Sequence, residues 1–66
     1  MKLDYDAKTD SLYVQFAQAP SVDSSEVSPG VTLDFDGKGN VVGIDFEHAS
    51  KKVDLKALDT RHFPLM

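Results

Sequence analysis

The sequence contains no cysteine, which excludes both a disulfide framework and a thiolate metal site. The same absence fits a reducing, intracellular compartment. Residues 1–6, MKLDYD, lack the apolar core of a signal peptide, and no run approaches the roughly 20 apolar residues of a membrane span. We therefore expect a cytoplasmic protein that has no membrane partner.

The chain is also short, with 66 residues for one domain over residues 1–66. A domain of this size buries only about 60% of the surface that its unfolded chain exposes. Because cysteine cannot reinforce so small a core, oligomerisation or a partner protein is the remaining means of stabilising it. We expect a homo-oligomer, and specifically a homodimer.

Basic residues are few and scattered, apart from Lys51 and Lys52, and the net charge is −4. This balance argues against binding to phosphate backbones, so we expect no nucleic-acid partner. It favours a basic protein partner. The alternative is an acidic surface that serves only to keep the protein in solution.

What the sequence does contain is an internal repeat, in which residues 3–16 (LDYDAKTDSLYVQF) align with residues 33–46 (LDFDGKGNVVGIDF). Five of the fourteen positions are identical, and four more pair similar residues, which is too regular for composition alone. In each copy, apolar residues alternate with polar ones on both sides of a four-residue turn at 7–10 or 37–40. This pattern predicts a β-hairpin that is used twice.

The alternation also predicts which residues face each other. A register that sets Tyr5 opposite Leu12, Leu3 opposite Val14, Phe35 opposite Val42 and Leu33 opposite Ile44 keeps every apolar side chain on one face. That face contains eleven side chains: Leu3, Tyr5, Leu12, Val14, Phe16, Val31, Leu33, Phe35, Val42, Ile44 and Phe46. One short helix covers only part of such a face, so the sheet must curl on itself or be covered by a second copy.

The expected organisation has four parts: a first hairpin over 2–16, a connecting loop over 17–30, a second hairpin over 31–47 and a short helical segment over 48–66. In the last part, Asp54 is an N-cap candidate before good helix formers, and Pro64 stops the helix. Phe63, Leu65 and Met66 then form an apolar tail. The predicted fold class is α+β, an antiparallel sheet of four main strands with a C-terminal helix. The alternative is a mostly-β curled sheet or a dimeric sandwich.

Few residues offer chemistry. Residues 34–45 resemble a calcium loop in spacing, but Lys38 occupies a position that needs an oxygen ligand, so a hairpin turn is strongly favoured. His48 and His62, with nearby carboxylates, form the one candidate for a metal or acid–base site, and nothing in the sequence fixes their geometry. No nucleophile or phosphate-binding motif is present. We therefore assign no catalytic residue, no metal ligand and no cofactor.

The acidic face of the predicted sheet is the more specific candidate. Charge for steering and an exposed aromatic anchor suit an interface with a basic protein. The alternative is a solvated face whose charges discourage aggregation between sheet edges. The candidate interaction surface consists of Asp4, Tyr13, Asp34, Asp45 and Glu47.

Four stretches together resemble the small bacterial proteins of domain-of-unknown-function family 2283: residues 3–6 (LDYD), 10–14 (DSLYV), 29–36 (PGVTLDFD) and 42–51 (VGIDFEHASK). The resemblance implies a cytoplasmic bacterial protein of unassigned role, with an antitoxin-like or regulatory binding role beside a toxin-like partner. It implies no catalytic residues. Our first hypothesis is therefore a non-enzymatic protein-interaction or regulatory module. The alternatives are a small metal protein or enzyme built on His48 and His62, and a purely self-associating domain.

Overall fold

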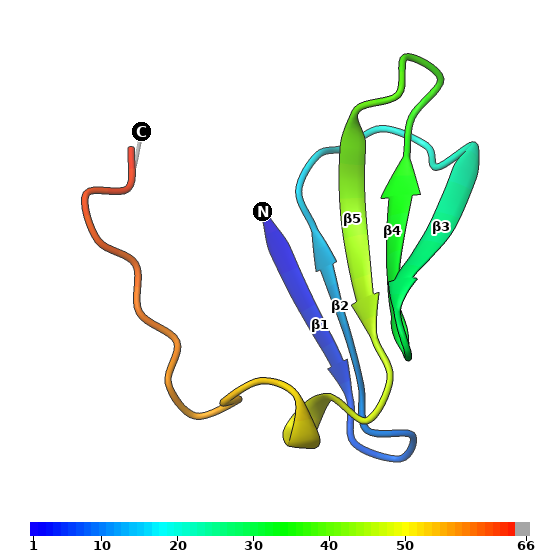
Figure 1. Ribbon diagram of the computed structural model, residues 1–66. Helices are drawn as coiled ribbons and strands as arrows, with labels where there is room; N and C mark the ends of the chain where they lie inside the picture. Colours follow the sequence, from blue (N-terminus) through cyan, green and yellow to red (C-terminus); the bar gives the residue numbers. More distant parts are fainter. Residues whose placement is uncertain (65–66) are drawn as a thin grey trace.

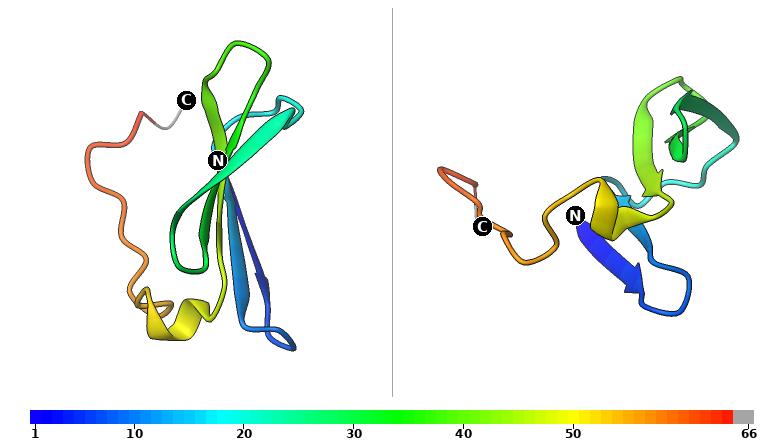
Figure 2. Two further views of the ribbon diagram at one scale, coloured as in Figure 1. Left: turned by 45° about the vertical axis from the view of Figure 1, so that its right-hand side comes forward. Right: turned by 60° about the horizontal axis from the view of Figure 1, so that its bottom comes forward.

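The computed structural model describes residues 1–64 and contains five β-strands followed by one turn of 3₁₀-helix (Figure 1). The strands are β1 (Lys2–Asp6), β2 (Ser11–Gln15), β3 (Asp23–Ser28), β4 (Val31–Phe35) and β5 (Val41–Phe46), and the 3₁₀-helix η1 spans Ala49–Lys51. All strand pairs are antiparallel, in the order β1-β2-β5-β4-β3. Seen edge-on, the sheet is a single twisted layer, with η1 and the chain after it on one side (Figure 2).

The hairpin β1–β2 has the register that the alternating pattern predicts. Leu3 lies opposite Val14, and Tyr5 lies opposite Leu12. In the turn, the Asp6 carboxylate accepts a backbone N–H two residues further on, at 2.9 Å. A short polar side chain thus replaces a backbone acceptor in the turn, which fixes the register of the whole hairpin.

The hairpin β4–β5 follows the prediction over most of its length. Leu33 lies opposite Ile44, as expected. The predicted pairing of Phe35 with Val42 is wrong, because Phe35 lies opposite Val41 after a register shift.

The turn between β4 and β5 explains this shift. The Asp36 carboxylate accepts the backbone N–H groups of Lys38 and Asn40, both at 2.9 Å, and the Asp36 N–H donates to the Asn40 carbonyl at 2.9 Å. These bonds hold residues 36–40 as a closed loop, with Gly39 at φ 83° where a side chain would be strained. The loop is one residue longer than that of the first hairpin, and the β5 strand accommodates the difference as a bulge.

The two hairpins meet through β2 and β5, and this pairing is symmetric. Val14 lies opposite Ile44, its own counterpart in the repeat. Leu12 lies opposite Phe46, and the equivalent positions 16 and 42 are joined by a backbone hydrogen bond of 2.8 Å. A pseudo-twofold axis perpendicular to the sheet therefore passes between Val14 and Ile44.

The connecting loop predicted over 17–30 contains a strand that the sequence pattern did not reveal. β3 pairs with β4, with Asp23 opposite Phe35 and Ser25 opposite Leu33, and a bulge lies between Glu26 and Ser28. Every residue of β3 is exposed, so no alternation of apolar and polar residues marks it. Its stability comes from main-chain pairing with β4, and polar residues at a sheet edge discourage pairing with other chains. The sheet thus has five strands rather than four.

The predicted C-terminal helix is wrong. Among residues 1–64 the only helical element is η1, so the chain is nearly all antiparallel β rather than α+β. Asp54, the expected N-cap, accepts the Lys56 N–H at 3.1 Å in an isolated turn. A helix shorter than about 12 residues is marginal in water unless it packs an apolar side against other elements. The predicted tail residues Leu65 and Met66 lie outside the described residues.

The core is small and lies on the side of the sheet that η1 partly covers. The buried apolar side chains are Leu12, Val42 and Ala49. The Ala49 N–H donates to the Asp10 carbonyl at 2.8 Å, which holds η1 against the turn of the first hairpin. Along residues 1–64, no helix is long and apolar enough to cross a membrane.

Candidate interaction surfaces

The outer face of the sheet carries the acidic residues that the sequence singled out. Strand pairing places Asp4, Tyr13 and Asp45 in one row across β1, β2 and β5. Asp34 lies in the neighbouring row on β4, opposite Gly43. Four of the five predicted interaction residues therefore share this face.

Glu47, the fifth, follows the end of β5. Its backbone N–H donates to the Gly30 carbonyl at 2.8 Å, and its own carbonyl accepts a hydrogen bond from the Lys52 ammonium group. Its backbone thus joins the β3–β4 turn to the chain after η1. Glu47 therefore lies outside both rows that the other four residues occupy.

Tyr13 does not stand free on the outer face. Its side chain crosses β5, and its hydroxyl donates to Asp34 Oδ2 at 2.9 Å. This hydrogen bond to a carboxylate, followed by desolvation, raises the pKa of Tyr13 above its usual value. The aromatic anchor expected from the sequence is therefore half-buried and already uses its polar group.

Gly43 makes this crossing possible. A Cβ atom at Gly43 would lie 2.0 Å from the Tyr13 hydroxyl oxygen. Gly43 is the counterpart of Tyr13 in the repeat. A large side chain at both positions would collide, so only one of the two equivalent positions carries a tyrosine. Sequence reasoning missed Gly43, although a glycine inside a strand is a signal of close approach by a neighbouring group.

A second cluster links the first hairpin turn to η1. Asp10 Oδ1 accepts the Tyr5 hydroxyl at 2.8 Å and the Ser50 N–H at 3.1 Å, and Asp10 Oδ2 accepts the Ser50 hydroxyl at 2.7 Å. The Ser50 hydroxyl and then the Tyr5 hydroxyl lower the pKa of Asp10. The pKa of Tyr5 is raised by the same bond. Each of these polar groups already has a partner, so the cluster acts as a joint in the fold.

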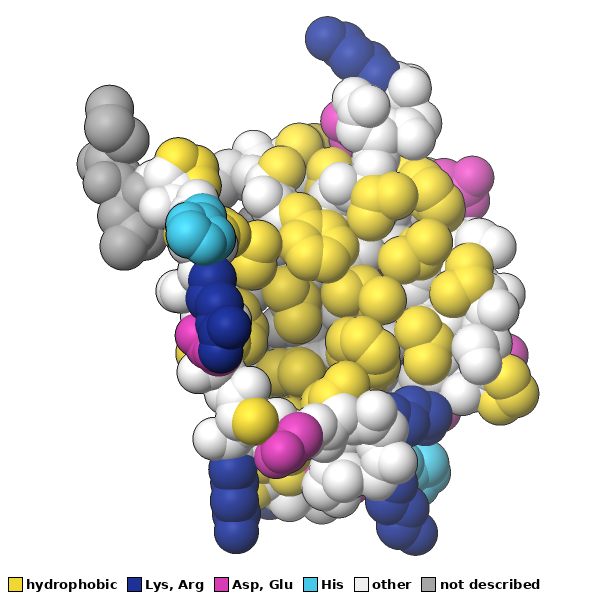
Figure 3. All heavy atoms as spheres, turned by 60° about the vertical axis from the view of Figure 1, so that its left-hand side comes forward, with side chains coloured by type: hydrophobic (Ala, Val, Ile, Leu, Met, Phe, Trp, Pro, Cys, Tyr) yellow, Lys and Arg dark blue, Asp and Glu magenta, His cyan; other side chains and the backbone are white. Residues whose placement is uncertain are grey.

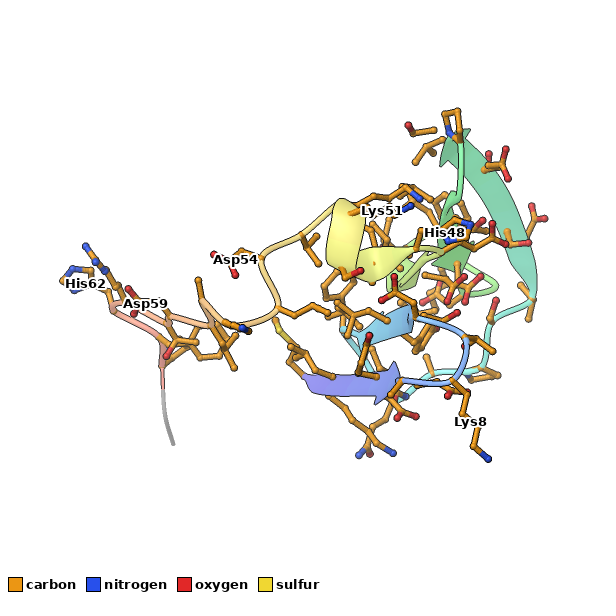
Figure 4. The ribbon with its side chains drawn as sticks, turned by 90° about the horizontal axis from the view of Figure 1, so that it is seen from below. Lys8, His48, Lys51, Asp54, Asp59 and His62 are labelled. Carbon is orange, nitrogen blue, oxygen red and sulfur yellow. The ribbon has the colours of Figure 1, made fainter. Side chains whose placement is uncertain are left out.

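The histidine alternative gains no geometric support. His48 precedes η1 at φ 52°, whereas His62 lies far along the chain after η1 at φ 58° (Figure 4). In the part of the chain that the structure describes, no three His, Cys, Asp or Glu side chains are grouped so that they could hold a metal ion.

The calcium-like spacing over 34–45 also has a structural use. Asp34 binds the Tyr13 hydroxyl, and the Asp36 carboxylate binds N–H groups of its own turn. The backbone N–H of Asn40 contributes most to lowering the pKa of Asp36. The hairpin and its turn therefore account for two of the three carboxylates of this stretch, those of Asp34 and Asp36.

The inner face of the sheet is apolar across four strands, and we define it by two rows of paired residues. One row runs over β1, β2, β5 and β4, and the second lies beside it on the same strands. The first row is Leu3, Val14, Ile44 and Leu33, and the second is Tyr5, Leu12, Phe46 and Val31. Figure 3 shows this face as a broad, continuous apolar surface.

Much of the inner face is in contact with solvent. Leu3 is 46% exposed and Tyr5 44%, and Phe16, directly after β2, is 42% exposed. Only Leu12 among the eight inner-face residues is buried. Exposed apolar patches of this extent mark surfaces that bind proteins, membranes or ligands.

The total surface area gives the same result independently. The chain exposes 5311 Å², whereas a compact monomer of 7.2 kDa exposes about 4,100 Å². The excess of about 1,200 Å² is at least the share of one partner, about 800 Å², in a stable protein–protein interface. The excess arises because the sheet is a single layer and the chain after η1 stands away from it (Figure 2).

Comparison with known proteins gives one match. The model of the family described as "Protein of unknown function (DUF2283)" matches residues 2–50, which covers all five strands and most of η1. The resemblance noted in the sequence is thereby confirmed. No curated protein and no solved structure matches the chain.

Proposed function

Because the chain belongs to the DUF2283 family, whose function is not assigned, its role must be inferred from its own surfaces, and we propose a non-enzymatic protein-interaction module that works as a homodimer. The observation that carries this proposal is the inner face, an apolar surface over four strands that the rest of the described chain leaves half-exposed. We propose the cytoplasm as its location, since a chain without cysteine depends on no disulfide.

A second copy is the occupant that fits this face best. Two sheets pack face to face about 10 Å apart with interdigitating side chains. Each sheet then covers the face of the other over an area equal to that of its own face. The flat footprint of the four apolar strands, each five or six residues long, is about 320 to 380 Å², and side-chain relief brings the accessible area closer to the share of one partner in a standard interface. A twofold interface also pairs identical patches, so the eight inner-face residues of one copy can pack against the same eight residues of the second copy.

Two substitutions on neighbouring residues of β4 test the homodimer. Leu33→Asp places a carboxylate on the inner face, and Thr32→Asp places the same charge on the outer face. We expect the wild type and Thr32→Asp to sediment at twice 7.2 kDa. Leu33→Asp should weaken dimerisation by at least about a hundredfold, because each copy would bury an unpaired charge.

A second inner-face variant separates loss of dimerisation from loss of folding. Phe16→Asp lies after the end of β2, where the side chain is 42% exposed and contributes less to the core than Leu33. We expect this variant to keep the far-UV circular dichroism of a β-sheet while dissociating at higher concentrations than the wild type. Equal dissociation constants for Phe16→Asp, Thr32→Asp and the wild type would contradict the homodimer.

A second candidate function uses the outer face, which in the dimer points outward on both sides. Asp4, Asp45 and Glu26 lie in one row there, with Asp34 in the next. We propose that this face binds a basic protein, and an antitoxin-like role is the case in which that protein is toxin-like. The observation that favours it is that these carboxylates share the outer face, which stays exposed when two copies pair through their inner faces.

Charge reversal on the outer face tests this second candidate. Asp45→Lys with Glu26→Lys changes the row without touching the Tyr13–Asp34 hydrogen bond. We expect the variant to remain dimeric and to lose any protein that copurifies stoichiometrically with the wild type. Retained copurification would place the contact elsewhere, and a wild type that purifies alone would remove the support for this candidate.

A further inference from the structure

The chain after η1 forms an arm, which we define as residues 53–64. The Val53 N–H donates to the Ala49 carbonyl at 2.9 Å and anchors the base of the arm to η1. Beyond Val53, the hydrogen bonds of the described arm are local, such as Ala57 N–H to the Asp54 carbonyl at 3.2 Å and Arg61 to Asp59 at 3.0 Å. No hydrogen bond joins residues 54–64 to a strand. The arm therefore stands beside the sheet without being part of it.

The arm carries apolar side chains that it does not bury. Leu55, Leu58 and Phe63 are exposed, with Leu58 at 74%. A short segment with three large apolar residues in solvent gains free energy from any apolar surface that it can reach. The arm lies outside the region that the family model matches, which ends at residue 50.

A groove between the arm and the sheet provides such a surface. Its volume is about 370 Å³, its floor is formed by Leu3, Tyr5 and Leu12 of the inner face, and its wall is formed by arm residues that include Leu55 and Leu58. The groove lies at the β1 margin of the sheet, where the arm runs along one border of the apolar face (Figure 3). The apolar floor and the apolar arm thus lie near each other, and Leu3, Tyr5, Leu55 and Leu58 all remain exposed.

The position of the arm relative to the sheet decides where it docks. The arm stands off one side of the sheet (Figure 2), and the groove that it shares with Leu3, Tyr5 and Leu12 identifies this side as the inner face. The second sheet of a face-to-face pair must lie on the same side. From the anchored Val53, five extended residues carry Leu58 up to about 17 Å, which exceeds the spacing of about 10 Å between two sheets packed face to face. The arm can therefore cross to a second copy, and exchange of identical elements between copies is a low-cost route to a dimer.

We propose that the arm of each copy docks on the floor of the groove in the second copy, with Leu55 and Leu58 packing against Leu3 and Tyr5. This inference rests on the proposed homodimer and adds to it the contact that closes the open β1 margin. Because the interface is twofold, two equivalent arm-to-groove contacts form in each dimer.

One substitution in the arm and a matched control measure its contribution. Leu58→Asp replaces the most exposed apolar residue of the arm, and Thr60→Asp introduces the same charge two residues further on. We expect Leu58→Asp to weaken dimerisation by at least about tenfold, because two leucine contacts are lost in each dimer. Thr60→Asp should leave the dissociation constant within about threefold of the wild type.

Mixing two complementary variants shows whether the arm docks on its own sheet or on that of the second copy. Leu58→Asp has a damaged arm and an intact floor, and Leu3→Glu has an intact arm and a damaged floor. If the arm docks on the second copy, the mixed dimer retains one intact contact, whereas either homodimer retains none. We expect the dissociation constant of the mixed dimer to be at least about tenfold lower than the geometric mean of the dissociation constants of the two homodimers, after correction for the twofold statistical factor.

The outcomes separate this inference from the proposed function. Two results together would overturn the exchange of arms: the mixture shows no preference for the mixed dimer, and Leu58→Asp dimerises as strongly as Thr60→Asp. The proposed homodimer would then still stand. A wild type that stays monomeric at every concentration would overturn both.

Discussion

The two hairpins have related sequences but different surroundings. β4, the first strand of the second hairpin, is partly buried along its whole length because β3 pairs with its outer edge. β1, its counterpart in the first hairpin, is an edge strand and is exposed at every residue. The difference shows that one half of a nearly symmetric sheet is completed by the chain itself. The other half is left open, on the margin where we propose that the arm of a second copy docks.

The position that differs most between the hairpins gives the largest expected effect on stability. Gly43→Ala would place a Cβ atom 2.0 Å from the Tyr13 hydroxyl oxygen and displace Tyr13 from Asp34. We expect the free energy of unfolding in urea to fall by about 2 to 3 kcal/mol.

Gly37→Ala is the matched control for that substitution. Gly37 has nothing within 4 Å of the added Cβ, and alanine is the residue at the equivalent position of the first hairpin. We expect an unchanged free energy or a gain of up to about 1 kcal/mol. A Gly43→Ala variant as stable as Gly37→Ala would show that Tyr13 does not cross β5.

The hydroxyl of Tyr13 gives a smaller effect. Tyr13→Phe keeps the ring over Gly43 but removes the hydrogen bond to Asp34. We expect a loss of about 0.5 to 1.5 kcal/mol near neutral pH.

The same bond predicts how the contribution of Tyr13 depends on pH. Because the bond raises the pKa of Tyr13 above 10.0, its stabilising effect is complete below pH 10 and is lost as the pH rises through the raised value. Urea unfolding of wild type and Tyr13→Phe should therefore give free energies that converge at strongly alkaline pH. A constant difference up to the highest pH would contradict this assignment.

The joint at Asp10 gives the smallest effect, and it appears on the acid side. Hydrogen bonds from Ser50 and Tyr5 lower the pKa of Asp10 below 3.8, so the stabilisation is complete above that pH and is lost as the pH falls through the lowered value. The difference in thermal midpoint between wild type and Asp10→Asn should accordingly shrink as the pH falls below 3.8. If the difference in thermal midpoint between wild type and Asp10→Asn did not vary with pH, the role of Asp10 would be contradicted.

Sequence reasoning succeeded where a local pattern determines structure. The first hairpin register and the Leu33–Ile44 pairing were predicted, because period-two alternation and turn residues act over short distances. The resemblance to the family, which rests on four short stretches of sequence, was also confirmed. The shift at Phe35 was missed because it depends on hydrogen bonds of the Asp36 carboxylate within the turn.

The failures came from tertiary effects. β3 is mostly polar and exists through pairing with β4. The stretch from residue 54 onward, predicted to be helical, leaves Leu55 and Leu58 exposed instead of packing them tightly against the sheet. The four-strand α+β prediction was wrong for these two reasons. Of the predicted interaction residues, Tyr13 and Asp34 are joined by a hydrogen bond that depends on Gly43. The glycine signals a close approach, but no local pattern identifies Tyr13 as the group that approaches.

The requirement that a second copy covers the inner face is tested most directly by sedimentation velocity of the wild type, from about 100 µM down to about 1 µM, with circular dichroism on the same samples. We predict a species of twice 7.2 kDa at the high end that dissociates toward the low end. A folded species of 7.2 kDa at all concentrations, with an unchanged β-sheet spectrum, would contradict the account.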